Sequence, residues 1–294
     1  MTSKVWIDGS VVDASEARIP VLDHGLLYGD GIFEGLRVVG RAVFRLEDHL
    51  ARLRAGARAI ELEIPGGLDG VRDIVLETAR AYDRDTAYLR LIVTRGEGAL
   101  GVDPTTCSEP RLLCIADRLR IYGTRELSRG IDLVTSSWRR PPADVLDPRV
   151  KSLNYLNSAL AKLEARRRGA DEALLLNTAG AVAEASVANV FVYRDGELRT
   201  PRTSDGILEG ITRATVLELA GTLGIPAAER TLGRFDLFSA DEVFLTGTGA
   251  GIVPVRSLDG QTLGAGVPGP ICAKIRAAYD DVAVSLGTPI DPRD

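Results

Sequence analysis

The sequence is poor in the residues that build metal sites and disulfide frameworks. Its 294 residues include only two histidines and three cysteines, and the cysteines are odd in number and lack the spacing of metal ligands. No apolar run reaches membrane-spanning length, and the first residues lack the apolar core of a signal peptide. A net charge of −5 gives no general electrostatic reason to bind nucleic acid or an anionic membrane. These features predict a cytoplasmic protein with no metal, nucleic-acid or membrane partner.

Lysine is also scarce, because only four of the 36 basic residues are lysines. Lys162 and Lys274 fall in charged helical patterns, and Lys4 lies near the N-terminus. Lys151 instead follows a break marked by Pro148 and precedes a new helical pattern. An amine that loses water at such a place becomes nucleophilic at neutral pH. An ordinary solvated lysine is the alternative interpretation of this stretch taken alone.

The length suits about two domains. The polar, glycine-containing segment 118–130 predicts a connection between a small domain at residues 1–117 and a larger one at 131–294. Short β-rich runs separated by turns are typical of antiparallel strands rather than of a doubly wound sheet. Apolar periodicity predicts helices at 47–60, from 69 onward, and at 153–168, 211–223 and 268–286. The helix at 153–168 is expected to bury Leu156, Leu160 and Leu163.

Two glycine-containing segments could bind an anion. Gly210-Ile-Thr212 opens a helix, where unpaired backbone N–H groups and the helix dipole favour negative charge. Thr246-Gly-Thr-Gly-Ala250 follows a predicted strand and is a second cradle for phosphate or carboxylate. Together with Lys151 and Glu184, these segments fit the requirements of pyridoxal phosphate. That cofactor needs a lysine for its aldehyde, donors for its phosphate and a carboxylate for its pyridine nitrogen.

Six ordered motifs resemble those of the fold-type IV pyridoxal-phosphate enzymes, most closely the branched-chain amino-acid aminotransferases. The resemblance extends over nearly the whole chain. It predicts an α/β (α+β) fold with a small N-terminal α/β domain and a larger C-terminal domain built on a pseudo-barrel mixed sheet. The motifs are Tyr28-Gly-Asp-Gly-Ile-Phe-Glu-Gly-Leu-Arg37, Thr86-Ala-Tyr-Leu-Arg90, Lys151-Ser-Leu-Asn-Tyr-Leu156, Ala183-Glu-Ala-Ser186, Leu208-Glu-Gly-Ile-Thr-Arg213 and Asp241-Glu-Val-Phe-Leu-Thr-Gly-Thr248.

The resemblance implies a role for each matching residue. Lys151 is expected to bind the cofactor's aldehyde and then to move a proton as general base. Tyr155 is expected at the cofactor's phenolic oxygen, and Glu184 at its pyridine nitrogen. The phosphate-binding residues implied by the match are Arg52, Ile211, Thr212 and Thr248.

The same resemblance implies a mainly apolar substrate pocket. Arg90 matches an arginine that lets this pocket also accept an acidic side chain, whereas a buried ion-pair partner is its alternative interpretation. The backbone of Gly249 and Ala250 is expected to hold the substrate α-carboxylate. The residues that match the remaining pocket positions are Tyr28, Phe33, Arg37, Tyr88 and the loop 98–102.

These matches predict a transaminase of L-leucine, L-isoleucine and L-valine that uses 2-oxoglutarate as amino acceptor. A D-amino-acid or (R)-amine transaminase, an aminodeoxychorismate lyase and a non-catalytic cofactor-binding protein remain alternatives. Two segments depart from the family pattern, Ala185-Ser-Val-Ala188 and Gly249-Ala-Gly251, and both bear on which substrates fit. The resemblance also implies a homodimer or a higher homo-oligomer.

Overall fold

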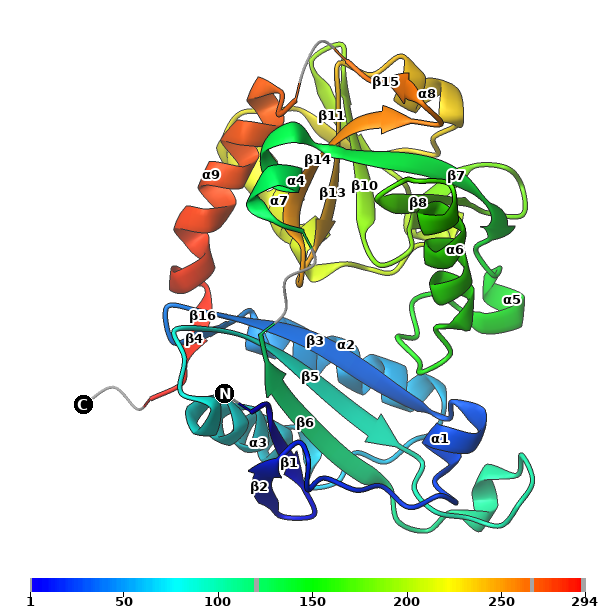
Figure 1. The fold of residues 1–294 in the computed structure, drawn as a ribbon, viewed down its shortest axis with the longest axis vertical. Coiled ribbons are helices and arrows are strands. Elements are labelled where there is room, and N and C mark those ends of the chain that lie inside the picture. Colours follow the sequence, from blue (N-terminus) through cyan, green and yellow to red (C-terminus); the bar gives the residue numbers. More distant parts are fainter. Residues whose placement is uncertain (1, 119–121, 265–266, 292–294) are drawn as a thin grey trace. The chain divides into compact units, whose positions relative to one another are not determined.

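The computed structural model describes residues 2–118, 122–264 and 267–291. Contacts divide the chain into two compact units (Figure 1). The first contains residues 1–119, 150–154 and 282–294, and the second contains 120–149 and 155–281. The segments 150–154 and 282–294 thus belong to the first unit, although the domain limits expected from the sequence assigned them to the larger domain. Those limits stay a prediction, and part of the expected connection, residues 119–121, lies outside the described residues.

The described residues of the first unit form a seven-stranded sheet in the order β16-β4-β3-β5-β6-β1-β2. Every neighbouring pair in this sheet is antiparallel, as the short turns in the sequence predict. The strands are β1 (Lys4–Ile7), β2 (Ser10–Asp13), β3 (Gly31–Val39), β4 (Ala42–Phe44), β5 (Thr86–Thr94), β6 (Arg111–Asp117) and β16 (Gly287–Pro289). The helices are α1 (His24–Tyr28), α2 (Leu46–Ala59) and α3 (Gly67–Tyr82), with a 3-10 turn at Pro104–Thr106.

The two faces of this sheet have different surroundings. Successive side chains of a strand point to opposite faces, so the even-numbered residues Ile32, Leu36 and Val38 of β3 share one face. They belong to the buried core that includes Leu50 of α2 and Val75 of α3. The odd-numbered residues of β3 therefore point away from these two helices, and this alternation decides which side chains can meet in the site.

The described residues of the second unit form a nine-stranded mixed sheet, with the path β12-β11-β10-β13-β14-β7-β8-β9 and with β15 paired to β14. Three pairings are parallel, namely β11 with β12, β14 with β7, and β7 with β8. The strands are β7 (Ile131–Arg139), β8 (Glu172–Leu176), β9 (Val182–Ala185), β10 (Asn189–Arg194), β11 (Glu197–Thr200), β12 (Ala227–Glu229), β13 (Glu242–Gly247), β14 (Gly251–Leu258) and β15 (Gln261–Thr262). The helices are α4 (Thr124–Arg129), α5 (Ala143–Leu146), α6 (Leu156–Arg167), α7 (Ile211–Thr222), α8 (Arg234–Phe238) and α9 (Pro270–Ser285), with a 3-10 turn at Thr203–Asp205. The last residues of α9, from 282 onward, belong to the first unit.

The connection between β9 and β10 shows that this sheet is curled. The two strands lie far apart in the pairing order, yet only three residues separate them in the chain. The backbone N–H of Ala185 donates to the carbonyl of Ala188 at 2.7 Å, which closes the turn between them. The sheet must therefore bend round until β9 meets β10, and Figure 1 shows β10, β13 and β14 as neighbouring strands of this curled sheet.

The buried face of α6 differs from the predicted one. Leu156 and Leu163 are exposed, at 70% and 44%, so their expected burial was wrong. The buried residues of this helix are Ser158, Ala161 and Ala165. Small side chains allow a helix to approach a sheet closely, and Ala161 and Ala165 share a buried cluster with Val134 of β7 and with residues of β8.

Candidate active site

Lys151 is held at a fixed register against the start of β3. The N–H of Phe33 donates to the carbonyl of Lys151 at 2.9 Å, and the N–H of Leu153 donates to the carbonyl of Gly31 at 2.9 Å. Between these bonds, Ser152 forms an isolated antiparallel bridge with Ile32. The Lys151 amine lies 4.4 Å from the centroid of the Phe33 ring. The backbone of this segment therefore fixes where the amine is presented.

Four of the predicted substrate-binding residues share the face of the sheet that points away from α2 and α3. Arg37 lies opposite Tyr88 in the ladder of β3 and β5, and Arg90 lies opposite Gly35. The Arg90 guanidinium lies 4.6 Å from the centroid of the Phe33 ring, and its Nη2 donates to the Tyr88 hydroxyl at 3.2 Å. The Nε of Arg90 is buried and has no hydrogen-bond partner among the described residues.

Gly35 makes this arrangement possible. A Cβ at this position would lie 2.0 Å from the Tyr88 hydroxyl oxygen and 2.7 Å from the ring carbon that carries it. The absent side chain thus leaves room for the tyrosine to lie across β3. Lys151, Phe33, Tyr88 and Arg90 consequently form one group in the first unit.

The predicted phosphate ligand Arg52 already has a protein partner. Its Nε and Nη2 donate to the two carboxylate oxygens of Glu34, at 2.8 and 2.7 Å. The Nδ1 of His49 lies 2.7 Å from Glu34 Oε2. Glu34 and His49 were not assigned as site residues from the sequence, although a carboxylate within an apolar strand is a signal of a buried ion pair.

Burial tends to raise the pKa of Glu34, but Arg52 and His49 together hold this pKa well below its usual range. Burial also lowers the pKa of His49, against the opposing effect of Glu34, and the positive charges of Arg52 and Lys151 lower it further. Glu34 is therefore ionised and His49 neutral at neutral pH.

Tyr28 contacts the loop 98–102, and both were matched to pocket positions in the sequence. The N–H of Gly101 donates to the Tyr28 hydroxyl at 2.8 Å. His24 supports the same loop, because its Nε2 lies 2.9 Å from the carbonyl of Ala99. The Tyr28 ring also packs edge-on against the His24 ring, with centroids 4.9 Å apart.

In the second unit, Glu184 of β9 is buried and surrounded by donors. Arg140 Nη2 lies 2.8 Å from Glu184 Oε1. The second oxygen accepts from Asn189 Nδ2 at 3.0 Å and from the Leu208 N–H at 3.1 Å. These groups stabilise the ionised form of the carboxylate. Sequence reasoning missed Arg140 and Asn189, since they lie 44 residues before and five residues after Glu184 in the numbering.

The N-terminus of α7 carries a buried hydroxyl without a partner. Gly210 is the N-cap and offers no side chain to the first N–H groups of this helix. A Cβ there would lie 2.0 Å from Asn189 Oδ1, so the backbone approaches that residue closely. Thr212, the second residue of α7, is only 1% exposed, and its Oγ1 has no hydrogen-bond partner among the described residues.

The predicted turn after β13 is a tight hairpin to β14. Gly247 pairs with Gly251, and the N–H of Ala250 donates to the carbonyl of Gly247 at 3.1 Å. Thr248, Gly249 and Ala250 form the half-buried tip. Thr246, just before the tip, belongs to the predicted cradle but was given no role of its own. It is fully buried, and its Oγ1 is a second hydroxyl without a partner among the described residues.

Tyr155 is the residue directly before α6. Its carbonyl accepts from the N–H of Ala159 at 2.9 Å, so its backbone closes the first turn of this helix. The chain therefore passes from Lys151 in the first unit to Tyr155 in the second within four residues.

A model of the amino-transferase class IV family matches residues 31–258, which is more than half of the chain. The chain belongs to the class IV aminotransferase family. The predicted family, fold-type IV architecture and enzyme class are thereby confirmed.

Individual relatives match this aminotransferase over almost its full length. A protein of Methanocaldococcus jannaschii is 44% identical over 284 residues, which cover 97% of this chain and 98% of the relative. The crystal structure of the Escherichia coli branched-chain amino acid aminotransferase has a TM-score of 0.93 at 33% identity, covering 98% of this chain and 96% of that one. The T.th. branched-chain amino acid aminotransferase with pyridoxamine 5'-phosphate has a TM-score of 0.92 at 36% identity, covering 97% and 95%. That enzyme has also been solved in complex with N-(5'-phosphopyridoxyl)-L-glutamate and with 4-methylvaleric acid.

The residues of this aminotransferase fit a phosphorylated pyridine cofactor. The Thr212 hydroxyl, which has no partner among the described residues, and the N-terminus of α7, which has no side-chain cap, offer donors for a phosphate. The carboxylate of Glu184 suits a protonated ring nitrogen, and the Lys151 amine suits an aldehyde. Within the part of the chain that is described, no group of three or more His, Cys, Asp or Glu residues could hold a metal ion.

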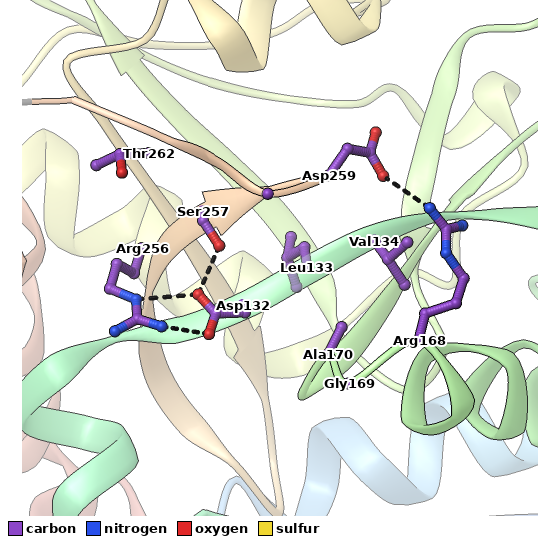
Figure 2. A pocket seen from close by; sticks show the side chains of 11 residues that line it. Asp132, Leu133, Val134, Arg168, Gly169, Ala170, Arg256, Ser257, Asp259 and Thr262 are labelled. Atoms are coloured by element: carbon purple, nitrogen blue, oxygen red, sulfur yellow. Dashed lines mark hydrogen bonds and ion pairs between the residues drawn. The ribbon is translucent and has the colours of Figure 1, made fainter.

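A cavity of about 480 Å³ lies in the second unit, and none of the predicted site residues lines it (Figure 2). Asp132 pairs with Arg256 at one side, and Asp259 lies 3.8 Å from Arg168 at the other. Each charged group that lines the cavity is thus neutralised by a neighbour. Its lining residues are Asp132, Leu133, Val134, Arg168, Gly169, Ala170, Arg256, Ser257, Asp259, Gly260 and Thr262.

No helix of residues 2–118, 122–264 or 267–291 is both long and apolar enough to span a membrane.

Proposed function

We propose that this aminotransferase transfers the amino group of L-leucine, L-isoleucine or L-valine to 2-oxoglutarate, with pyridoxal phosphate as cofactor. The observation that carries the proposal is the group around Phe33. An amine and a guanidinium both lie close to one aromatic ring, at 4.4 Å for Lys151 and 4.6 Å for Arg90. An amine beside an apolar surface and the Arg90 guanidinium suits a pocket that accepts branched apolar chains and also an acidic one.

The relatives support both halves of this reaction. The T.th. enzyme has been solved in complex with 4-methylvaleric acid, a branched apolar acid, and with a phosphopyridoxyl derivative of L-glutamate. In this chain, Phe33 and Tyr88 offer the apolar surface. The buried Nε of Arg90, which has no partner among the described residues, is suited to a side-chain carboxylate. The N–H groups of Gly249 and Ala250 would hold the α-carboxylate.

When bound, the cofactor supplies an aldehyde that takes up the amino group and a protonated ring that withdraws electrons. Lys151 would hold the cofactor through its amine until the substrate amine displaces it, and the released Nζ would then accept the proton from the substrate Cα and return it to the cofactor carbon. Glu184 would keep the ring nitrogen protonated, and Tyr155 would donate to the phenolic oxygen. The family match, which covers residues of both units, supports proposing Arg52, Ile211, Thr212 and Thr248 as the phosphate-binding residues.

The proposed substrates are tested by measuring half-reactions. The purified protein is mixed with single amino donors, and the change in the cofactor spectrum is followed. L-leucine, L-isoleucine, L-valine and L-glutamate should react at least about tenfold faster than D-alanine or (R)-1-phenylethylamine. An Arg90→Met variant should lose about tenfold to a hundredfold with L-glutamate, because a charge-assisted hydrogen bond is worth roughly 1.5–3 kcal/mol, and should react normally with L-leucine.

Three other results would replace the proposal with one of its alternatives. Faster reaction with D-alanine or the (R)-amine would indicate a D-amino-acid or (R)-amine transaminase. Release of pyruvate from aminodeoxychorismate without an oxo-acid acceptor would indicate a lyase. A purified protein that shows no spectral change with any donor would indicate a cofactor-binding protein without catalysis.

The phosphate-binding role of Thr212 predicts opposite effects on cofactor affinity and on folding. A Thr212→Val change removes a buried hydroxyl that has no partner among the described residues, so the free energy of unfolding without cofactor should stay the same or rise. The affinity for pyridoxal phosphate should fall about tenfold, the effect of one lost hydrogen bond to a charged group. Thermal melting and equilibrium dialysis measure the two quantities.

Thr215 provides the matched control for this change. It lies in the same helix, is also 1% exposed, and its hydroxyl donates to the carbonyl of Ile211 at 2.9 Å. A Thr215→Val change should leave the cofactor affinity unaltered and should not raise stability. Equal loss of affinity in both variants would contradict a specific role of the Thr212 hydroxyl.

We also propose a homodimer or a higher homo-oligomer, supported by a cluster of exposed apolar side chains around α1 and the loop 98–102. The two segments are adjacent, because Asp23 forms a β-bridge with Glu97. Apolar patches of this kind usually mark contact surfaces. A monomer at micromolar concentration in sedimentation analysis would contradict this. The exposed side chains are Ile19, Val21, Leu22, Leu26, Leu27, Leu100 and Val102.

The proposed location is the cytoplasm. Its support is that all three cysteines are free and that Cys114 and Cys272 are buried thiols, which fits a reducing compartment. Recovery of the protein in a secreted fraction would contradict this location.

A further inference from the structure

We propose that Glu34 and His49 act together as positioning residues that orient Arg52 for binding the cofactor phosphate. The inference rests on the proposed phosphate-binding role of Arg52. It adds two residues, Glu34 and His49, to which the sequence analysis assigned no role.

The geometry around Glu34 fixes the plane of the Arg52 guanidinium. Two parallel hydrogen bonds, at 2.8 and 2.7 Å, join the guanidinium to both carboxylate oxygens. Such a bidentate pair allows one orientation of the planar group, whereas a single bond would leave it free to rotate. The backbone of Glu34 is in turn held in place because its strand, β3, is paired along its whole length with β5.

His49 completes the arrangement by holding the carboxylate. Its Nδ1 lies 2.7 Å from Glu34 Oε2, the oxygen that also accepts from Arg52 Nη2. An ionised carboxylate accepts only, so Nδ1 must carry the imidazole proton and donate. The Nε2 is then an acceptor, and it is buried without a partner among the described residues. His49 therefore acts on Glu34 through one nitrogen.

The protonation states keep this arrangement constant near neutral pH. The charged groups that face His49 are Glu34 from β3, Arg52 from α2 and Lys151 from the segment 150–154. Burial and the two cations keep His49 neutral, and the pKa of Glu34 is held well below its usual range. Glu34 and Arg52 thus form a pair without net charge. Directed N–H groups, rather than an excess of positive charge, are what such a pair offers to a phosphate.

Two substitutions of His49 distinguish the effect of its N–H donor from the effect of its side-chain volume. His49→Asn retains an N–H₂ group near the position of Nδ1, whereas His49→Leu fills the space without a donor. Each full-length variant is dialysed against pyridoxal phosphate and, separately, against pyridoxal, which lacks the phosphate. We expect His49→Leu to bind pyridoxal phosphate about tenfold more weakly, the effect of one lost hydrogen bond to a charged group, and to bind pyridoxal normally. His49→Asn should bind both like the unmodified protein.

A Glu34→Gln variant provides a second measurement should His49→Leu fold poorly. Its amide group replaces one acceptor by a donor, so it should also lose about tenfold in affinity for pyridoxal phosphate alone. Thermal melting checks that each variant is folded.

An Arg52→Met variant separates the inference from the proposed function on which it rests. If Arg52→Met binds pyridoxal phosphate normally, the phosphate-binding role of Arg52 fails. If Arg52→Met loses affinity while His49→Leu and Glu34→Gln do not, the positioning role fails and the phosphate role stands. An equal loss for pyridoxal and pyridoxal phosphate in His49→Leu overturns the inference, because it indicates a general structural defect. Equal losses in His49→Asn and His49→Leu also overturn it, since the Nδ1 donor would then not be the group that matters.

Discussion

A Lys151→Ala variant should lose at least about a thousandfold in transamination rate, because its amine is proposed both to hold the cofactor and to move the proton. General acid–base catalysis alone contributes about 10² to 10⁴ in rate. The carbonyl of Lys151 and the N–H of Leu153 anchor the segment to β3 through backbone bonds, which the substitution leaves in place. The loss should therefore appear in turnover rather than in the melting temperature. Turnover is measured with L-leucine and 2-oxoglutarate.

Two controls narrow the interpretation of this result. Lys151→Arg keeps a positive charge near the Phe33 ring but has no amine that can bind the aldehyde or accept a proton at neutral pH, so it should be equally inactive. Lys274→Ala removes a lysine of α9 whose amine makes only a long contact of 3.5 Å with the carbonyl of Leu223, and it should retain normal activity. Near-normal turnover in either Lys151 variant would refute the assignment.

A Glu184→Gln variant should lose about a hundredfold in turnover and also some stability. A neutral amide cannot keep a ring nitrogen protonated, and a hydrogen bond to a charged group is worth roughly 1.5–3 kcal/mol. The same change turns one acceptor into a donor that faces Arg140, Asn189 or the Leu208 N–H, all of which now donate to the carboxylate. The free energy of unfolding should fall as a consequence.

Glu172 supplies the matched control for that variant. It is a second fully buried carboxylate of the same unit, and it accepts from Lys162 at 2.7 Å, from Ser186 at 2.6 Å and from Tyr122 at 3.1 Å. Glu172→Gln should lower the melting temperature without the hundredfold loss of turnover per folded molecule. If both variants lose turnover equally, the effect of Glu184→Gln arises from disturbed packing, and its role at the ring nitrogen is not supported.

Sequence reasoning predicted best the features that depend on neighbouring residues. The helix α2 and the antiparallel pairing of strands joined by short turns, such as β1 with β2, follow from local periodicity and turn residues. Lys151 was identifiable because lysine is rare in this chain and because it stands at a break in the pattern. The parallel pairing of β7 with β8 was not indicated, since it depends on which strands meet after the chain crosses through α6.

The hydrogen-bond and ion-pair partners of the site residues could not be predicted from the sequence. Arg140 reaches Glu184 from another segment of the chain, and His49 reaches Glu34 from a helix. No spacing rule connects such residues. The buried face predicted for α6 was wrong for a related reason. Apolar spacing alone does not reveal that a helix packed closely against a sheet requires small residues, such as Ala161 and Ala165, at the contact.

The close contact between Gly35 and Tyr88 limits which substitutions the substrate pocket can accept during evolution. Any side chain at position 35 would meet the tyrosine at 2.0 Å, so the tyrosine would have to leave its place over β3 first. Without it, Arg90 would lose the hydroxyl that accepts from its Nη2. A substitution at position 35 is therefore tolerated only together with changes at positions 88 and 90, and a library that varies position 35 alone would sample mostly disrupted pockets rather than new specificities.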